Sequence, residues 1–254
     1  MNVLSLFDGM SCGQIALDQL GIKVDNYYAA EIDKYAIEIA KKNYPNIIHL
    51  GDVTKIKGED LPQIDLLIGG SPCQGFSFAG KQLNFDDPRS ALFFEYVRLL
   101  KETNPKYFLL ENVRMKQEYQ DIITEHLNVK PVAINSDRFI HQNRYRLYWT
   151  NLNVELLPER PNWDNKYYQW RRSYFRENKS GVCPTLVAAM GTGGNNVPLH
   201  SKNIKDKITP EECEILQTVP VGYTEGVSNT QRYKMLGNGW TVEVIKHIFK
   251  NMDV

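Results

Sequence analysis

The chain has 254 residues, and its 30 Lys and Arg side chains are balanced by 30 Asp and Glu, so the net charge is zero. This length predicts one or two domains and a core that needs no disulfide or metal to hold it together. The neutral charge excludes an acidic disordered tail, and no apolar run reaches the roughly 18 residues of a membrane helix. The N-terminal residues lack a basic stretch and reach Asp8 too early for a signal peptide. Four scattered cysteines without a CxxC pair predict no metal site and favour the reducing cytoplasm.

The first 150 residues alternate between short apolar runs and amphipathic segments. Strands are predicted at residues 2–7, 27–32, 47–50, 64–68, 106–110, 129–135 and 145–150. Helices are predicted at residues 13–20, 33–43 and 91–103, with one more before residue 129. This alternation is typical of an α/β fold in which helices cover both faces of a parallel sheet. A short link joins the last two strands, so we expect that pair to be antiparallel.

The pattern breaks from about residue 151 to 227, where Pro, Gly, Asn and aromatic residues dominate and predict a second, irregular lobe. Thr209 is a candidate N-cap, because Pro210 follows it and Glu212 completes a capping box. A last helix is predicted at residues 242–251. We therefore expect three regions, at residues 1–150, 151–227 and 228–254.

The neutral total hides local charge. Residues 1–60 carry six basic and nine acidic side chains, whereas residues 141–180 carry eight basic and four acidic ones. The second window also holds nine aromatic residues. Interleaved basic and aromatic residues fit either a surface that meets phosphates and bases or a solvated face over a small satellite core.

Three acidic residues follow the first three predicted strands, where a doubly wound sheet binds its ligands. They are Asp8, Glu31 and Asp52. Gly9 and Gly13 allow the first loop to approach a ligand closely. Glu31 lies 22 residues beyond Gly9, a spacing typical of an acid that accepts hydrogen bonds from ribose hydroxyls. An ordinary surface acid is the alternative for Glu31, but the three together favour a nucleoside-type cofactor.

The fourth predicted strand ends in GGSPCQGFS, which places Cys73 at the sheet edge. A buried small hydrophobe is the alternative for this cysteine, but its Gly and Pro neighbours argue against a core position. The long polar segment at 75–88 is typical of a lid over a reactive group. Glu111 follows the fifth strand, so a carboxylate is expected near the thiol. Two arginines, Arg144 and Arg146, are expected on one face of a strand, where they could hold a phosphate or carbonyl oxygen.

In chain order, these segments resemble the motifs of the DNA (cytosine-5) methyltransferases. The matching segments are LFDGMSCG (6–13), Glu31, Asp52-Val53, SPCQGFS (71–77), ENV (111–113), QNRYR (142–146) and LGNGW (236–240). The first and last motifs look like those of the animal de novo enzymes, while the chain length is similar to that of bacterial and phage members. The resemblance spans nearly the whole chain outside the middle of the second lobe.

The resemblance implies a Rossmann-like S-adenosylmethionine-dependent methyltransferase sheet with a small, irregular target-recognition lobe at residues 151–227. It implies that residues 1–150 form the catalytic and cofactor-binding domain, to which residues 228–254 return. It also implies that S-adenosylmethionine is held by Phe7, Asp8, Gly9, Cys12, Gly13, Glu31, Ile32, Asp52, Val53, Pro72, Asn238, Gly239 and Trp240.

The implied reaction is methylation at C5 of cytosine in double-stranded DNA. Cys73 attacks C6, Glu111 shares a proton with the ring nitrogen N3, Arg146 holds the base carbonyl, and Arg144 supports this group. Because the thiol must reach the ring, the base is flipped out of the helix. The residues expected to contact DNA are Gln74, Ser77, Lys81, Arg171, Arg172, Arg176 and Thr185.

Three alternatives remain open at this stage. The chain could be an RNA methyltransferase of the same family, although it lacks the Cys-Phe-Thr segment of that branch. It could be a non-catalytic relative, although such proteins usually lose the reactive cysteine or the cofactor loop. Cys73 could be a redox or structural thiol, which would leave Glu111 and the arginine pair without a purpose. We expect a cytoplasmic monomer, in a bacterial or phage-infected cell, with DNA and no membrane as its partner.

Overall fold

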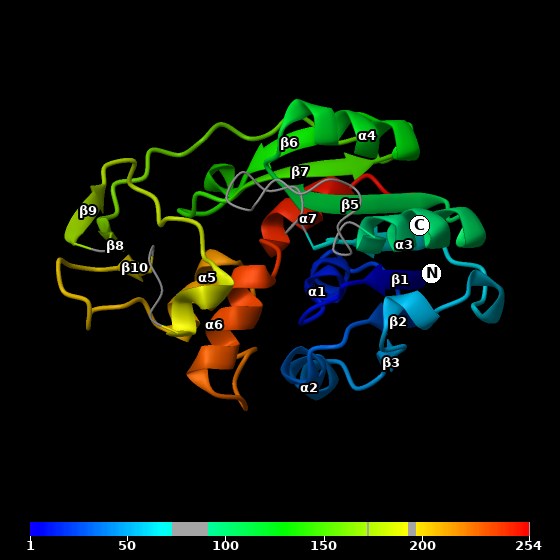
Figure 1. The fold of residues 1–254 in the computed structure, drawn as a ribbon, viewed down its shortest axis with the longest axis horizontal. Helices are drawn as coiled ribbons and strands as arrows, with labels where there is room; N and C mark the ends of the chain where they lie inside the picture. The colour runs from blue at the N-terminus through cyan, green and yellow to red at the C-terminus, as the bar shows by residue number, and fades with distance from the viewer. Residues whose placement is uncertain (73–90, 172, 193–196, 254) are drawn as a thin grey trace.

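The computed structural model describes residues 1–72, 91–171, 173–192 and 197–253. Seven strands form one sheet (Figure 1): β1 (Asn2–Leu6), β2 (Asn26–Ala30), β3 (Ile48–His49), β4 (Leu66–Gly69), β5 (Tyr107–Val113), β6 (Val132–Asn135) and β7 (Tyr145–Thr150). Their order across the sheet is β3-β2-β1-β4-β5-β7-β6. The first five strands run parallel to one another, whereas β7 is antiparallel to both β5 and β6. The α/β class and the antiparallel last pair are therefore confirmed.

Alternating residues of the strands build two separate cores. On one face, Val3 packs in a cluster with α1 (Cys12–Gln19), α2 (Lys34–Asn43) and α7 (Val242–Phe249). On the other face, Leu4 and Leu6 pack in a cluster with α3 (Ala91–Thr103) and α4 (Gln117–Leu127). This division follows from the period of two in a strand, which sends successive side chains to opposite faces. The continuous apolar run of β1 is thus explained by burial on both sides.

The sheet has its topological switch point at β1. The chain proceeds from β1 to β2 and β3 on one side, and then crosses to β4 and β5 on the other. A crevice opens outside the carboxyl ends of the strands at such a point. The loops after β1 and β4 meet there, and they carry two of the predicted motifs.

The β5 strand is longer than the sequence predicts, because it continues through Val113. Glu111 consequently lies inside a strand instead of beyond its end. Register places Glu111 opposite Tyr148 and Val113 opposite Arg146. Cross-strand neighbours on one face lie close together, so this pairing positions Glu111 and Arg146 as diagonal neighbours.

The prediction of a wholly irregular second lobe is wrong in one part. Three short strands, β8 (Tyr167–Arg171), β9 (Tyr174–Asn178) and β10 (Pro198–Leu199), form an antiparallel sheet with the order β10-β8-β9. Figure 1 shows this sheet at one end of the molecule, away from β1 to β3. Each strand has five residues or fewer, and a two-residue link joins β8 to β9, so the sequence gives little periodicity to detect.

Of the C-terminal helices, α5 (Pro210–Leu216) and α7 were predicted from the sequence and α6 (Asn229–Asn238) was not. In α5 the capping box is confirmed, because Thr209 Oγ1 accepts from the Glu212 N–H and Glu212 Oε2 from the Thr209 N–H. The last helix, α7, starts as predicted at Val242. The sequence missed α6, whose polar composition and Gly237 disguise its helical period. No helix in the described part of the chain is both long and apolar enough to span a bilayer.

A buried ion pair joins α5 to α6. The fully buried Glu214 carboxylate accepts hydrogen bonds from the backbone of Gly222 at 2.6 Å and of Thr224 at 2.8 Å. Arg232 Nη2 lies 3.2 Å from the same carboxylate, and Arg232 Nη1 lies 2.6 Å from Glu211. A buried charge is tolerated only when its partners are all present. This cluster therefore depends on Glu214.

Replacing Glu214 with alanine is expected to lower the free energy of unfolding by about 3 kcal/mol. The change removes one partner of Arg232 and leaves two backbone N–H groups without their acceptor. Urea denaturation measures the loss. Glu243→Ala is the matched control, because Glu243 pairs with Lys246 at the surface, and it should change stability by no more than about 1 kcal/mol. Equal, small losses in the two variants would contradict this account.

Candidate active site

A cavity of about 570 Å³ opens at the carboxyl edge of the sheet, beside the switch point at β1. This volume is within the range of small-molecule sites. The described residues predicted for the cofactor or for catalysis line this cavity, with the exception of Gly13. They are Phe7, Asp8, Gly9, Cys12, Glu31, Ile32, Asp52, Val53, Pro72, Glu111, Arg144, Arg146, Asn238, Gly239 and Trp240. Segments more than 200 residues apart in the sequence thus meet in one cavity.

Gly13 serves the fold and does not line the cavity. A Cβ built at this position would stand 2.3 Å from Ile68 Cδ1 and 3.0 Å from the Tyr27 hydroxyl. A side chain at this position would have to displace Ile68 Cδ1 or the Tyr27 hydroxyl, so Gly13 allows α1 to pack closely on the sheet. The expectation that Gly13 also lets the loop approach a ligand stays a prediction.

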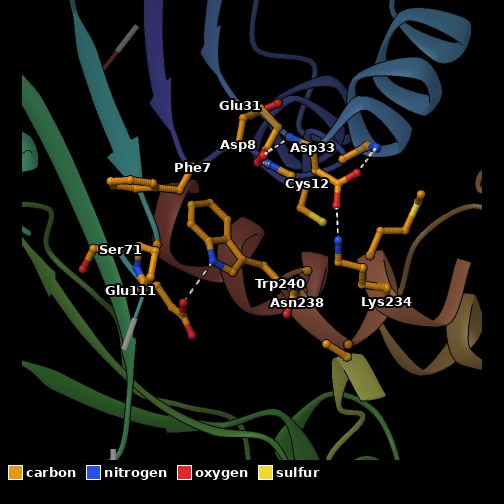
Figure 2. A pocket seen from close by; sticks show the side chains of 18 of the residues that line it. Phe7, Asp8, Cys12, Glu31, Asp33, Ser71, Glu111, Lys234, Asn238 and Trp240 are labelled. Atoms are coloured by element: carbon orange, nitrogen blue, oxygen red, sulfur yellow. Dashed lines mark hydrogen bonds and ion pairs between the residues drawn. The ribbon is translucent and has the colours of Figure 1, made fainter. Parts of the chain in front are cut away.

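The loop after β1 has an unusual backbone. Phe7, Gly9 and Ser11 all have positive φ, at 57°, 61° and 64°. For Phe7 and Ser11 such a conformation costs energy and persists only when the surroundings enforce it. The Phe7 ring and the Trp240 indole both face the cavity in Figure 2.

Asp8 holds this loop in place. Its carboxylate accepts hydrogen bonds from the hydroxyls of Ser5 at 2.6 Å, Ser11 at 2.5 Å and Tyr27 at 2.8 Å. Burial raises the pKa of Asp8 to about 6, and the three hydroxyl donors oppose that shift. These hydrogen bonds connect β1, β2 and the start of α1, so Asp8 fixes the geometry of the loop between them.

The carboxylates at the ends of β2 and β3 face the same cavity. Glu31 Oε2 accepts the Gly9 N–H at 2.8 Å, and its Oε1 accepts from Ile32 and Asp33, each also at 2.8 Å. Glu31 was predicted as a ligand residue from its spacing to Gly9, and in the structure its carboxylate also holds the Gly9 backbone in the first loop. Asp52 Oδ1 accepts from the backbone and hydroxyl of Thr54. Each carboxylate oxygen has more than one lone pair, so both residues retain acceptor capacity toward a ligand.

An ion pair that the sequence analysis missed also borders the cavity. Lys234 Nζ on α6 lies 2.5 Å from Asp33 Oδ2, and Asp33 is the N-cap of α2. Figure 2 shows this contact linking the N-terminal and C-terminal parts of the site. Asp33 could be recognised in the sequence as a candidate N-cap, because it stands at the start of a predicted helix. Its pairing with Lys234 could not be recognised, because the two residues are 201 positions apart.

At the other end of the cavity, Glu111 has a partner for each carboxylate oxygen. Arg146 Nε lies 2.8 Å from Oε1, and the Trp240 indole N–H donates to Oε2 at 3.2 Å. Glu111 is buried and Arg146 largely so. Glu111 and Arg146 thus form a close ion pair that opens on the cavity, and their expected convergence on Cys73, which lies outside the described residues, stays a prediction.

Arg144 behaves differently from the expected partner of Arg146. It lies just before β7, and its buried guanidinium donates to the backbone carbonyls of Leu186 at 3.2 Å, Gly237 at 3.2 Å and Gly239 at 2.7 Å. Burial lowers the pKa of this guanidinium to about 9, and the nearby charge of Arg146 acts in the same direction. Arg144 thus lines the same cavity as Arg146, while its own hydrogen bonds go to backbone carbonyls of the protein, and its expected support of the catalytic group stays a prediction.

Several predicted residues lie outside the part of the chain that the structure describes. These are Cys73, Gln74, Ser77, Lys81 and Arg172. Thr185 is described, and its hydroxyl donates to the Asn143 carbonyl at 2.5 Å. Arg171 on β8 and Arg176 on β9 share one face of the small sheet, because Gln169 pairs with Arg176 and Arg171 with Tyr174. Tyr174 is 59% exposed, so this face combines basic and aromatic groups at the surface.

The donor set of the cavity fits S-adenosylmethionine. Carboxylates at two strand ends match ribose hydroxyls and an amino group, and the aromatic face of Phe7 matches a purine ring. No group of three or more His, Cys, Asp or Glu residues arranged for a metal ion occurs in the described ranges.

Similar proteins point in the same direction. The model of the C-5 cytosine-specific DNA methylase family matches residues 1–169 and 135–253. The type II methyltransferase M.Bsp6I of Bacillus sp. is 33% identical over 99% of this chain and 98% of its own length. The type II methyltransferase M1.ScrFI of Lactococcus lactis is 32% identical over 98% of this chain and 77% of its own length.

Solved structures share the fold. The Dnmt2 methyltransferase of S. pombe has a TM-score of 0.72 and 18% identity, with 98% of this chain and 97% of that chain covered. The methyltransferase EhMeth of Entamoeba histolytica has a TM-score of 0.74 and 18% identity, with 100% and 99% covered. With a family model across nearly all of its length and relatives at about one-third identity, the chain belongs to the C-5 cytosine-specific DNA methylases, S-adenosylmethionine-dependent enzymes that methylate cytosine in DNA.

Proposed function

We propose that the chain methylates C5 of cytosine in double-stranded DNA through a covalent bond between Cys73 and C6 of a flipped base. The observation that carries this proposal is the Glu111–Arg146 ion pair at the inner end of the cavity, 2.8 Å between Nε and Oε1. Pro72 lines the same cavity, and Cys73 is the next residue in the sequence, outside the described residues. Glu111, Arg146 and Pro72, the described neighbour of Cys73, thus line one cavity, which supports the proposal.

The chemistry needs a nucleophile because C5 of cytosine is unreactive by itself. The Cys73 thiolate bonds to C6 while the C5–C6 double bond opens, so C5 becomes nucleophilic. S-adenosylmethionine, when bound, supplies an electrophilic methyl group. A base then removes the C5 proton, the double bond forms again, and the bond between Sγ and C6 breaks to return the thiolate.

Glu111 and Arg146 stabilise the charge that this attack creates. Electron density moves from C6 toward N3 and the carbonyl of the ring. A Glu111 carboxyl that shares its proton with N3 neutralises the charge that develops on this nitrogen. Arg146 is close enough to Glu111 to reach the carbonyl of the same base. Both side chains are largely withdrawn from water, where such interactions are stronger than at the surface.

We further propose a division of labour along the chain. Residues 1–150 provide the cofactor and catalytic site, residues 151–227 recognise the target, and residues 228–254 return to close the cavity. The contribution of Asn238, Gly239 and Trp240 to the cavity supports the last assignment. The basic and aromatic face of the small sheet, with Arg171 and Arg176, supports the second.

The cofactor site is tested by removing Glu31. Glu31→Ala should weaken S-adenosylhomocysteine at least about tenfold in calorimetric titration, because a charged acceptor and the anchor of the Gly9 N–H are both lost. Glu38→Ala, on the exposed side of α2, is the matched control and should bind normally. An unchanged affinity in Glu31→Ala would remove this residue from the pocket.

The DNA-binding lobe is tested by its basic face. Replacing Arg171 and Arg176 together with alanine should weaken DNA binding and reduce the slope of log K against log salt by about two. The charge-matched control replaces Lys23 and Lys130 with alanine. Both side chains are exposed, and they precede β2 and β6 at the amino edge of the seven-stranded sheet. If the control loses as much affinity and slope, the assignment of residues 151–227 is wrong.

The covalent step is tested with DNA that contains 5-fluorocytosine at the target. Fluorine cannot leave as a cation, so the bond between Cys73 and C6 should persist after methyl transfer. The adduct should survive denaturing electrophoresis, require S-adenosylmethionine, and map to the peptide that contains Cys73.

Cys73→Ala should abolish this adduct and leave S-adenosylhomocysteine affinity nearly intact. The three remaining cysteines, Cys12, Cys183 and Cys213, are buried and provide internal controls. Trapping in Cys73→Ala, or a label on one of these three, would overturn the mechanism.

A further inference from the structure

Trp240 belongs to two sites at once. Its side chain lines the cofactor cavity, and its indole N–H donates to Glu111 Oε2 at 3.2 Å (Figure 2). The other oxygen of the same carboxylate faces Arg146 Nε at 2.8 Å. One rigid side chain therefore connects the group expected to act on cytosine with the wall of the cofactor cavity.

The backbone around Trp240 is anchored on both sides. The Gly239 carbonyl accepts from Arg144 at 2.7 Å and from Gln217 Nε2 at 3.1 Å. The Thr241 hydroxyl donates to Gln217 Oε1 at 2.8 Å. Arg144, Gln217 and Thr241 are all buried. The direction of the indole is thus set by the fold before any ligand arrives.

Gly70 leaves the space in which this hydrogen bond forms. A Cβ at position 70 would stand 3.1 Å from Glu111 Oε2 and 3.1 Å from Trp240 Nε1. Both distances are shorter than ordinary van der Waals contact, so a methyl group there would press against both the donor and the acceptor. The backbone of Gly70 has no positive φ that would itself demand glycine.

The chemistry of the indole fixes how it holds the carboxyl. An indole N–H is a donor only, so this contact uses one lone pair of Oε2 and leaves the rest of the carboxyl available to the base. Three other polar groups lie near Glu111: Arg146, Arg144, and Tyr148, which stands opposite it in the register. Burial raises the pKa of Tyr148, so the phenol stays neutral.

We propose that Trp240 is a positioning residue for the reaction, which holds the Glu111 carboxyl in the orientation from which it acts on the base. This role rests on the proposed function of Glu111. The indole N–H donates to Oε2, whereas cytosine N3 has a lone pair that accepts a proton, so the indole contact is compatible with a docked base. The ring of Trp240, on the cofactor side, is a separate contribution that phenylalanine can retain.

The test compares the single-turnover rate of methyl transfer at saturating cofactor with the affinity for S-adenosylhomocysteine. Trp240→Phe keeps an aromatic ring and removes the donor that orients Glu111. The single-turnover rate should fall by about tenfold, because one hydrogen bond to a charged group is lost. Affinity for S-adenosylhomocysteine should stay within about threefold of the wild type, because the wall of the cavity is preserved.

Gly70→Ala is the second variant, and it leaves the indole in place. Its methyl group presses against both Nε1 and Oε2, so the single-turnover rate should fall in this variant as well. A rate equal to that of the wild type in both variants overturns the proposal. So does a loss of S-adenosylhomocysteine affinity in Trp240→Phe as large as the loss of rate, which is the result that a simple packing role in the cavity wall predicts.

The experiment with 5-fluorocytosine distinguishes a failure of the Trp240 role from a failure of the covalent mechanism. If the wild type forms the Cys73 adduct and the variants methylate at the wild-type rate, the role of Trp240 is wrong and the covalent mechanism stands. If the wild type forms no adduct, the covalent mechanism fails and the role of Trp240 fails with it.

Discussion

The active site depends on one buried cation. Arg144 donates to the carbonyls of Leu186, Gly237 and Gly239, which come from two segments about 50 residues apart. A buried guanidinium needs its donors satisfied, and these carbonyls supply acceptors that no helix or strand uses. The arrangement therefore fixes the entry to β7, the segment after Thr185 and the end of α6 relative to one another. Together with the hydrogen bonds of Gln217 and the Lys234–Asp33 ion pair, it holds the residues that close the cavity above the sheet.

A set of direct backbone contacts reinforces the same junction. A Cβ at Gly237 would stand 2.3 Å from the Val187 carbonyl carbon, and one at Gly191 would stand 2.7 Å from Thr230 Cα. The helix α6 and the turn η4 (Ala188–Thr192) thus touch through their main chains. Such contacts have no flexible side chain between them, so movement at one end of the pair is transmitted to the other.

Much of the catalytic half was predictable because parallel sheets impose strong rules. Once strands and helices alternate, the residues that follow successive strands must lie at one edge, and Glu31 and Asp52 were placed there by this rule. The small sheet, α6 and the Asp33–Lys234 pair were not predictable. Their signals are short, polar or separated by up to 201 positions, and only tertiary contacts bring them together.

Gly13 and Arg144 each belong to a motif that contributes to the cavity. The resemblance assigns Gly13 to the cofactor and Arg144 to the support of the catalytic group. In the structure, Gly13 makes room for Ile68, and Arg144 binds backbone carbonyls. A motif contains residues that hold the site together as well as residues that touch the ligand. Sequence spacing does not separate these two kinds, whereas atomic distances do.

The left-handed backbone at Phe7 and Ser11 has a consequence for how the enzyme meets its cofactor. Each such residue costs of order 1–3 kcal/mol, and folding meets that cost through the hydroxyl groups gathered around Asp8. The loop therefore does not have to be ordered when the cofactor arrives. The same loop can bind the reactant and release the product repeatedly without refolding. The energetic cost of its strained backbone is therefore met during folding and not in each catalytic cycle.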